Sequence, residues 1–160
     1  MPPPRNIIAL KQTYEEKYQT TIPVFVAGGM FTAKDAAHVM ELGADGIQAA
    51  TRFVATEECD ASDAYKQAYV NASDKSPVGM PGRAIKNAFI ERMLAAPDKI
   101  SHCFNCLKAC NPATAPYCIT QALINAVVGD LDNGLIFCGS RVGEITKITT
   151  VPKLMQELTV

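Results

Sequence analysis

Two short apolar segments, each followed by a turn of small residues, constrain the fold of this chain more than any other feature. The first runs Ile22-Pro-Val-Phe-Val-Ala-Gly-Gly-Met30, and the second runs Gly46-Ile-Gln-Ala-Ala-Thr-Arg-Phe53. A continuous apolar run that ends in glycine is typical of a strand buried in a parallel sheet. Residues 33–42 between them are predicted to form one helix, because Thr32 and Asp35 match a capping box. The order strand, helix, strand predicts a parallel βαβ unit.

Two such turns at the ends of consecutive strands are what the last two strands of a (β/α)₈ barrel offer to a flavin or a phosphorylated ligand. A closed barrel of this kind needs about 250 residues, whereas the chain has 160. We therefore predict an α/β fold that comprises the C-terminal part of a (β/α)₈ TIM barrel, namely its last two strands and helices. Residues 1–72 are predicted to form this phosphate-binding part, and residues 73–160 a helical, Cys-containing C-terminal extension.

The remaining elements are predicted from apolar periodicity and from capping residues. The predicted strands are 21–27, buried on both faces, and 46–53. Irregular segments are expected at 73–82 and 96–116. The other predicted helices are 7–19, 62–71 with Asp60 as its cap, 83–95, 117–128, and 151–158 with Thr150 as its cap.

The composition describes a globular chain without an obvious polyanionic partner. Hydrophobic residues make up 48%, charged residues 19%, and the formal net charge is −1. Lys and Arg form no stripe, which argues against binding to nucleic acid or to anionic lipid. No apolar run approaches the roughly 18 residues of a membrane span. Six cysteines without a secretory leader indicate a reducing compartment, so we expect a cytoplasmic location.

The two turns have the chemistry of a phosphate site. A phosphate dianion binds where several backbone N–H groups converge without side-chain obstruction. Gly28 and Gly29 have no Cβ, so the backbone can approach the phosphate oxygens closely. The N–H groups of Ala50 and Thr51, with the Thr51 hydroxyl, can complete the cradle. The helix that begins near residue 33 is expected to direct its positive end to the same place.

A Gly-Gly pair alone can also be no more than a tight turn between a strand and a helix. The second turn, at the matching position after the next strand, favours the phosphate site over that alternative. Gln48 is expected to point into the barrel beside the ligand.

Five segments carry a resemblance to a known family. They are 22–29, 42–48, 51–58, 82–87 and 130–139, and together they extend over nearly the whole chain. The sequence resembles the FMN-dependent nitronate monooxygenases, formerly called 2-nitropropane dioxygenases. That family also includes the FMN-dependent enoyl-ACP reductases.

The resemblance implies an FMN cofactor, a (β/α)₈ barrel, and oxidation of alkyl nitronates with O₂. It also implies specific cofactor contacts in this chain. The residues implied to bind FMN are Gly28, Gly29, Ala50 and Thr51 at the phosphate, and Gly139 and Ser140 in a loop near the flavin ring.

The family's catalytic histidine stands in a Gly-Gly-His motif in the earlier half of its sequence. Nothing in this chain matches that motif, and neither His38 nor His102 is expected to act as a base. We therefore predict no catalytic residue here. The chain is expected to be incomplete as an enzyme, as a fragment or a split gene product would be. Self-association or a partner chain that supplies the missing half of the barrel is then expected.

Four cysteines fall within sixteen residues of one Pro-rich segment. They are Cys103, Cys106, Cys110 and Cys118. Four thiolates in a short loop can gather around one zinc ion or one iron–sulfur cluster, and the C-x₂-C pair is the strongest element of that pattern. The alternative is that Cys106 and Cys118 pack as small apolar residues and the others are free thiols. Cys59 and Cys138 are expected to be packing residues.

Three functions therefore remain open from the sequence. The first is FMN-dependent oxidation of nitronates, and the second is FMN-dependent reduction of enoyl-ACP, which requires a nicotinamide donor. The third is a non-enzymatic metal-binding or iron–sulfur module with the partial barrel as its scaffold. The absorption spectrum separates a flavin from an iron–sulfur cluster.

Overall fold

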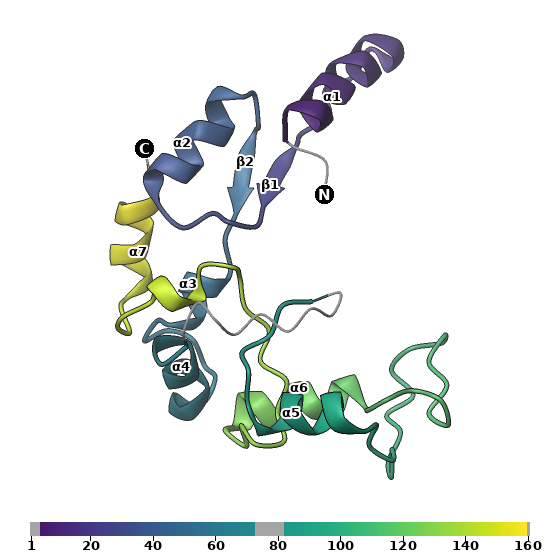
Figure 1. Cartoon of the computed structure of the whole chain (residues 1–160). Helices are drawn as coiled ribbons and strands as arrows, with labels where there is room; N and C mark the ends of the chain where they lie inside the picture. The colour runs from purple at the N-terminus through teal and green to yellow at the C-terminus, as the bar shows by residue number, and fades with distance from the viewer. Residues whose placement is uncertain (1–3, 73–81, 160) are drawn as a thin grey trace.

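A parallel pair of short strands, joined by one crossover helix, forms one end of the molecule (Figure 1). The computed structural model describes residues 4–72 and 82–159. Strand β1 (Phe25–Ala27) pairs in parallel with β2 (Gly46–Gln48), and helix α2 (Ala33–Glu41) connects them. The predicted βαβ unit is therefore confirmed.

The ends of α2 follow the capping signals of the sequence. The Thr32 hydroxyl accepts a hydrogen bond from the Asp35 N–H at 3.2 Å, and the Asp35 carboxylate accepts one from the Thr32 N–H at 2.7 Å. After the helix, Gly43 has a φ of +100°, a left-handed conformation that glycine adopts without strain. These two local devices fix where the crossover helix begins and ends.

Both strands are shorter than the sequence predicts, and β1 is not buried on both faces. Phe25 is 64% exposed, because within the described residues the sheet has no third strand. Its ring lies over Gly46, where an added Cβ would come within 2.7 Å of the ring. Strand β2 ends at Gln48, and the chain then turns into the short helix α3 (Thr51–Val54) instead of continuing as a strand.

The five other predicted helices are present in the predicted order, but several of their starts differ, and a 3₁₀ turn that the sequence did not predict is added. They are α1 (Pro4–Tyr18), α4 (Asp63–Val70), α5 (Ala88–Ala95), α6 (Ile119–Val128), the 3₁₀ turn η1 (Val142–Glu144) and α7 (Val151–Leu158). Helix α4 is capped by Ser62, whose hydroxyl accepts from the Tyr65 N–H, and not by Asp60. In α7, Thr150 occupies the N-cap position, but its side chain makes no capping bond.

Helix α5 begins at Ala88 and not at Arg83, because the preceding residues pair with a distant segment. The Ile85 N–H donates to the Ile136 carbonyl at 2.8 Å, and the Cys138 N–H donates to the Arg83 carbonyl at 2.9 Å. This antiparallel contact holds residues 83–86 extended. The segment 96–116 is irregular, as predicted, whereas residues 73–81 of the predicted loop lie outside the described part.

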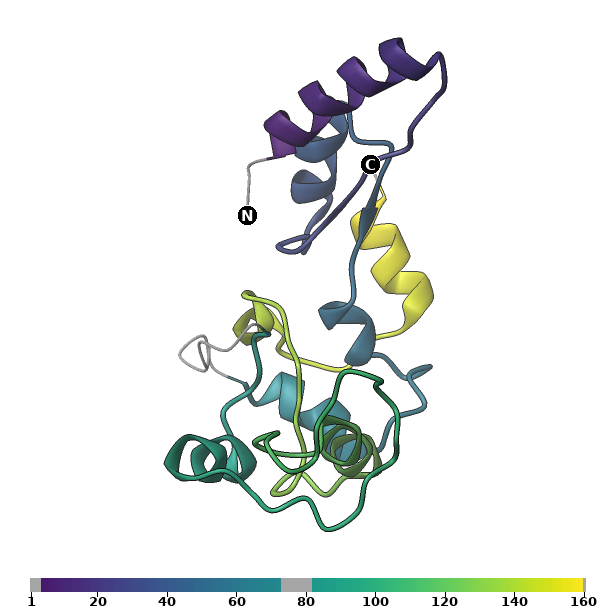
Figure 2. The same cartoon turned by 90° about the vertical axis from the view of Figure 1, so that its right-hand side faces the viewer.

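Most of the core lies in the second part of the molecule, around α4, α5 and α6 (Figure 2). Tyr69 of α4 is 2% exposed, and its hydroxyl donates to the Phe137 carbonyl at 2.6 Å. The larger cluster combines residues from before and after the predicted division near Ser73. Its buried members are Ala55, Tyr69, Ile85, Ala126, Ile136, Val142 and Ile145.

The last helix returns to the first part of the molecule. In both views α7 lies beside α2, and the two helices are in contact (Figures 1 and 2). Because α7 also contacts α3, the C-terminal segment connects the βαβ unit to the rest of the molecule. Within residues 4–72 and 82–159, no helix is long and apolar enough to cross a membrane.

Candidate functional site

A cavity of about 240 Å³ opens at the carboxyl ends of the two strands. Three separate segments line it, and they are residues 27–31, 48–51 and 139–141. All six residues that the sequence assigns to the cofactor lie on this lining, and so does Gln48. The fold therefore brings together two turns and a loop that are distant in sequence. That these residues bind a cofactor stays a prediction.

The first wall is the turn after β1. Gly28 has a φ of +87° and Gly29 a φ of +75°, which L-residues with a side chain rarely adopt. An added Cβ at either glycine would meet no other atom within 4 Å. The requirement for glycine thus comes from the backbone conformation, and it leaves the backbone facing open space.

The second wall is the turn after β2, where Ala50 occupies the N-cap position of α3 and Thr51 is its first residue. The N–H groups of Ala50 and Thr51 donate to no acceptor in the described part of the chain. The Thr51 hydroxyl oxygen accepts from the Gly139 N–H at 2.8 Å. Its own hydrogen remains free to be donated, so the hydroxyl can hold the third wall and still contact a ligand.

The positive end of α2 does not serve the cavity as the sequence predicts, because Asp35 already neutralises it. One oxygen of this carboxylate accepts from the Phe31 N–H at 3.1 Å and from the Thr32 N–H and hydroxyl. Burial opposes ionisation, but the hydrogen bonds from Thr32, Phe31 and Arg141 lower the pKa of Asp35 to about 2. The helix terminus is therefore paired with an anion of its own chain.

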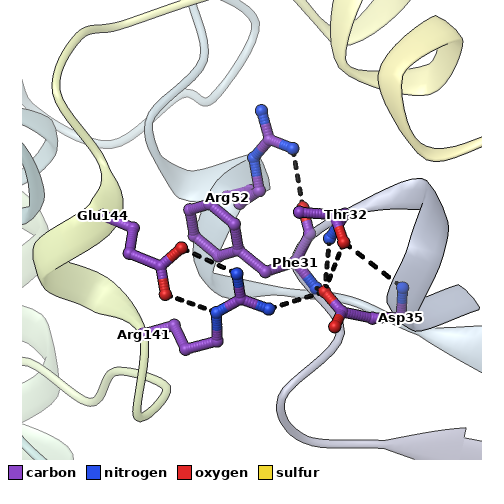
Figure 3. Close-up of polar contacts among 6 residues, drawn as sticks. All are labelled: Phe31, Thr32, Asp35, Arg52, Arg141 and Glu144. Atoms are coloured by element: carbon purple, nitrogen blue, oxygen red, sulfur yellow. Dashed lines mark hydrogen bonds and ion pairs between the residues drawn. The ribbon is translucent and has the colours of Figure 1, made fainter.

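Arg141 is a lining residue that the sequence reasoning missed. Its Nη1 donates to Asp35 at 2.6 Å, while Nε and Nη2 bind the Glu144 carboxylate as a fork (Figure 3). Its guanidinium lies 4.7 Å from the centre of the Phe31 ring, and Arg52 lies 4.8 Å from the same centre. Its position in the sequence could have identified it as a lining residue, because it is the first charged residue after Gly139-Ser140.

The cavity offers groups that hold a ligand, but it offers no proton-transfer residue. Among residues 4–72 and 82–159, Arg141 is the one ionisable side chain on its lining, and its pKa is raised by hydrogen bonds from its guanidinium to Glu144 and Asp35, so it stays charged. His38 lies in α2, and His102 lies in the irregular segment before α6; neither lines this cavity. Backbone donors, one hydroxyl and apolar walls suit the binding of an anionic cofactor better than catalysis by the chain itself.

The structure does not support the predicted metal site. The four cysteines line one pocket of about 70 Å³. However, no group of three His, Cys, Asp or Glu side chains within residues 4–72 and 82–159 could hold a metal ion. The Cys106 sulfur accepts from the Thr120 hydroxyl at 2.9 Å, and the Cys103 sulfur from the Asn105 N–H at 3.4 Å. These thiols are thus engaged locally and do not converge.

The two remaining cysteines stand apart from this group. Cys138 packs against the larger core cluster, as predicted, and burial raises the pKa of its thiol against the opposite influence of Arg83. Cys59 is half-buried.

Comparison with known proteins identifies relatives for most of the chain. The sequence model of the nitronate monooxygenase family matches residues 6–160. A probable nitronate monooxygenase of Staphylococcus saprophyticus is 36% identical over 88 residues, which cover 51% of this chain and 25% of that protein. A second, from Staphylococcus aureus, is 33% identical over 79 residues. This chain thus spans about a quarter of the length of these curated relatives.

Solved structures give the same result in three dimensions. FabK from Thermotoga maritima superposes with a TM-score of 0.68 at 30% identity, over 87% of this chain and 43% of that one. A nitroalkane oxidase from Streptomyces ansochromogenes superposes with a TM-score of 0.60 at 23% identity, over 89% and 40% of the two chains, which supports the fold alone. The match of the family model over residues 6–160 leads to one conclusion: this chain belongs to the nitronate monooxygenase family.

Proposed function

We propose that this chain provides the FMN-binding part of an oxidoreductase that oxidises alkyl nitronates with O₂. The single observation that carries the proposal is the cavity at the ends of β1 and β2, where two turns expose backbone donors to open space. Membership of the nitronate monooxygenase family gives the proposal its choice of cofactor and reaction.

The lining residues suit the two ends of FMN. Gly28, Gly29, Ala50 and Thr51 would hold the phosphate through backbone N–H groups and one hydroxyl. Gly139 and Ser140 would lie against the flavin ring, on the wall opposite the strand ends. Bound FMN would supply the redox chemistry, by taking electrons from the nitronate and passing them to O₂.

A base and the rest of the enclosing barrel would have to come from other residues or from a partner chain. β1 has one neighbouring strand in the described part, and its first residue, Phe25, is 64% exposed. An open strand of this kind presents unpaired backbone groups and apolar surface, which favours association with another segment. We therefore include self-association or a complementary chain in the proposal.

Reduction of enoyl-ACP is the second candidate, because the sequence resemblance also includes the FMN-dependent enoyl-ACP reductases. The two reactions differ in their electron source, since the reductase consumes a nicotinamide donor. A metal-binding module is not favoured, because the cysteines form no ligand group in the described residues.

Flavin binding is the first test of the proposal. The chain is titrated into FMN and flavin fluorescence is followed, with riboflavin as the ligand that lacks the phosphate. We expect FMN to bind at least tenfold more tightly than riboflavin, because tenfold corresponds to about 1.4 kcal/mol and several charge-assisted hydrogen bonds would be lost. Equal affinity for the two would contradict the phosphate site.

A second assay separates the two reactions. The flavin-loaded protein, with its complementary half if one is needed, is supplied with a nitronate under O₂ or with a nicotinamide donor and an enoyl thioester. Oxygen uptake that depends on the nitronate supports the first proposal. Oxidation of the nicotinamide that depends on the enoyl thioester supports the second.

A further inference from the structure

The third wall of the cavity comes from a distant part of the chain. Thr51 and Gly139 are 88 residues apart, yet the Gly139 N–H donates to the Thr51 hydroxyl at 2.8 Å. Among the described residues, Arg141 adds an ion pair with Asp35, in the first turn of α2, at 2.6 Å. Its guanidinium also lies 4.7 Å from the centre of the Phe31 ring in the first wall. Gly139 and Arg141 therefore carry contacts of the third wall with the segments that face it.

Arg141 is bound on both sides of its guanidinium. The Glu144 carboxylate accepts from Nε and from Nη2, and Asp35 accepts from Nη1 (Figure 3). A planar guanidinium can make such a forked contact and reach a second carboxylate, whereas an ammonium group cannot reproduce this geometry. The side chain is 30% exposed, so solvent only partly screens these contacts.

Asp35, which binds Arg141 from the start of α2, is itself fixed. Asp35 accepts from the Phe31 N–H and from Thr32, which holds its carboxylate at the start of α2. Phe31 is held from the other side by Arg52, whose Nη1 donates to the Phe31 carbonyl at 2.8 Å. Its ring lies between the two guanidiniums (Figure 3). Arg141 thus connects the third wall to Phe31 of the first wall and to the start of α2.

We propose that Arg141 is a positioning residue, which holds Gly139 and Ser140 over the cavity and so encloses the ring of the flavin. This inference rests on the proposed function, because the flavin is the ligand that the wall would cover. Two carboxylates already offset the charge of Arg141, so its contribution is to the placement of the wall and not to attraction of the phosphate. Its effect should therefore be the same for flavins with and without a phosphate.

The test compares FMN and riboflavin binding in wild-type protein and in Arg141→Gln, by quenching of flavin fluorescence. We expect Arg141→Gln to weaken the binding of both flavins by the same factor, about tenfold, because the charge-assisted hydrogen bonds to Asp35 and Glu144 are lost. Arg141→Lys should recover less than half of the lost binding free energy, that is, of the change in the logarithm of the flavin affinity. The matched control is Arg92→Gln, which removes an arginine bound to the Asp132 carbonyl and Asn133 outside the cavity, and it should leave both affinities unchanged.

Two results of this titration would overturn the inference. Unchanged affinities in Arg141→Gln would show that the wall does not need this residue. Weaker binding of FMN with unchanged binding of riboflavin would show that Arg141 contacts the phosphate directly. Glu144→Gln replaces Arg141→Gln in the test if Arg141→Gln does not fold. It should weaken the binding of both flavins by the same factor. Unchanged affinity for both flavins in Glu144→Gln would overturn the inference.

A flavin-free measurement keeps the inference separate from the proposed function. If wild-type protein binds neither flavin, the proposed function fails, and hydrogen exchange of the Gly139 amide then decides the inference alone. We expect this amide to exchange at least several-fold faster in Arg141→Gln than in wild type, because its bond to Thr51 opens more often. An unchanged exchange rate would overturn the role of Arg141.

Discussion

Glycines are needed in this chain for two different reasons. Gly28 and Gly29 are needed for their positive φ, since an added Cβ would meet no atom within 4 Å. Gly134 is needed for space, because its Cβ would lie 2.6 Å from the Cα of Ala126 in the core. The first pair shapes the cavity, whereas Gly134 lets the segment before it pack against α6.

These glycines should respond differently to alanine. Gly29→Ala should lower the free energy of unfolding by about 1–2 kcal/mol through backbone strain. It should also weaken FMN binding. Gly134→Ala should lower the free energy of unfolding by about 1–3 kcal/mol, because the helix backbone at Ala126 cannot move aside. The FMN affinity of the folded fraction should be unchanged. Urea unfolding and flavin titration of both variants check this. A Gly29→Ala protein with wild-type affinity for FMN would contradict the assigned turn.

The Asp35 carboxylate predicts a specific dependence of stability on pH. Its folded-state pKa of about 2 lies below the ordinary value of 3.8. Its contribution to stability is therefore complete above pH 3.8 and is lost as the pH falls toward 2. We expect Asp35→Asn to lower the thermal midpoint at pH 6, and the difference from wild type to shrink below pH 3.8. A difference that stays constant from pH 6 to pH 2 would contradict the ion pair and capping contacts.

At the scale of elements, residues with local partners were predictable and residues with distant partners were not. The capping box of Thr32 and Asp35 and the stop at Gly129, with a φ of +103°, fix helix ends through neighbours in sequence. The start of α5 was predicted too early because residues 83–86 pair with a segment some fifty residues later. Strand lengths were overestimated because they depend on neighbouring strands.

The same distinction applies to the cavity. Its two turns could be predicted because glycine at a strand end has a local meaning, and the loop at Gly139 came from family resemblance. Arg141 could not be predicted, since its partners Asp35 and Phe31 lie about a hundred residues away. The cysteine spacing suggested a site, but spacing alone did not determine where the sulfurs point.

Helix α5 offers a prediction about a cap that also joins two elements. The Asn87 side chain accepts from the Ile90 N–H at 3.1 Å and donates to the carbonyls of Leu131 and Gly134. Asn87→Ala should therefore cost about 2 kcal/mol or more, above the roughly 1 kcal/mol of a simple cap, because two carbonyls also lose their donor. Thr150→Ala is the control, since Thr150 makes no side-chain capping bond, and should cost less than about 0.5 kcal/mol. Equal losses in chemical denaturation would contradict the role of Asn87.

At the scale of the whole molecule, the described residues form a cavity at the strand ends with no base on its lining. The chain also spans about two fifths of the solved structures that it resembles. Catalysis requires reacting groups held in near-attack geometry, and one loop over a flavin ring does not supply a base. The activity of the isolated chain is therefore a test of how much of the enzyme these residues contain.

We expect the isolated chain to be inert on alkyl nitronates in the presence of FMN, and to self-associate. Oxygen consumption and light scattering measure the two properties in the same sample. Addition of a polypeptide that supplies the complementary barrel half should reduce scattering and restore oxygen uptake. Turnover at an ordinary enzymatic rate by a monodisperse monomer would contradict the interpretation as an incomplete barrel.

The buried Tyr69 gives the protein an optical property. The chain has five tyrosines and no tryptophan, so tyrosines dominate its near-ultraviolet absorbance. Burial, and then the hydrogen bond with Tyr65, raise the pKa of Tyr69 far above its usual value. In an alkaline titration Tyr69 will therefore stay protonated while the fold is intact, and its absorbance change will come only when the core around α4 opens. The protein therefore contains its own chromophore for the loss of its core, at a wavelength that tryptophan does not obscure.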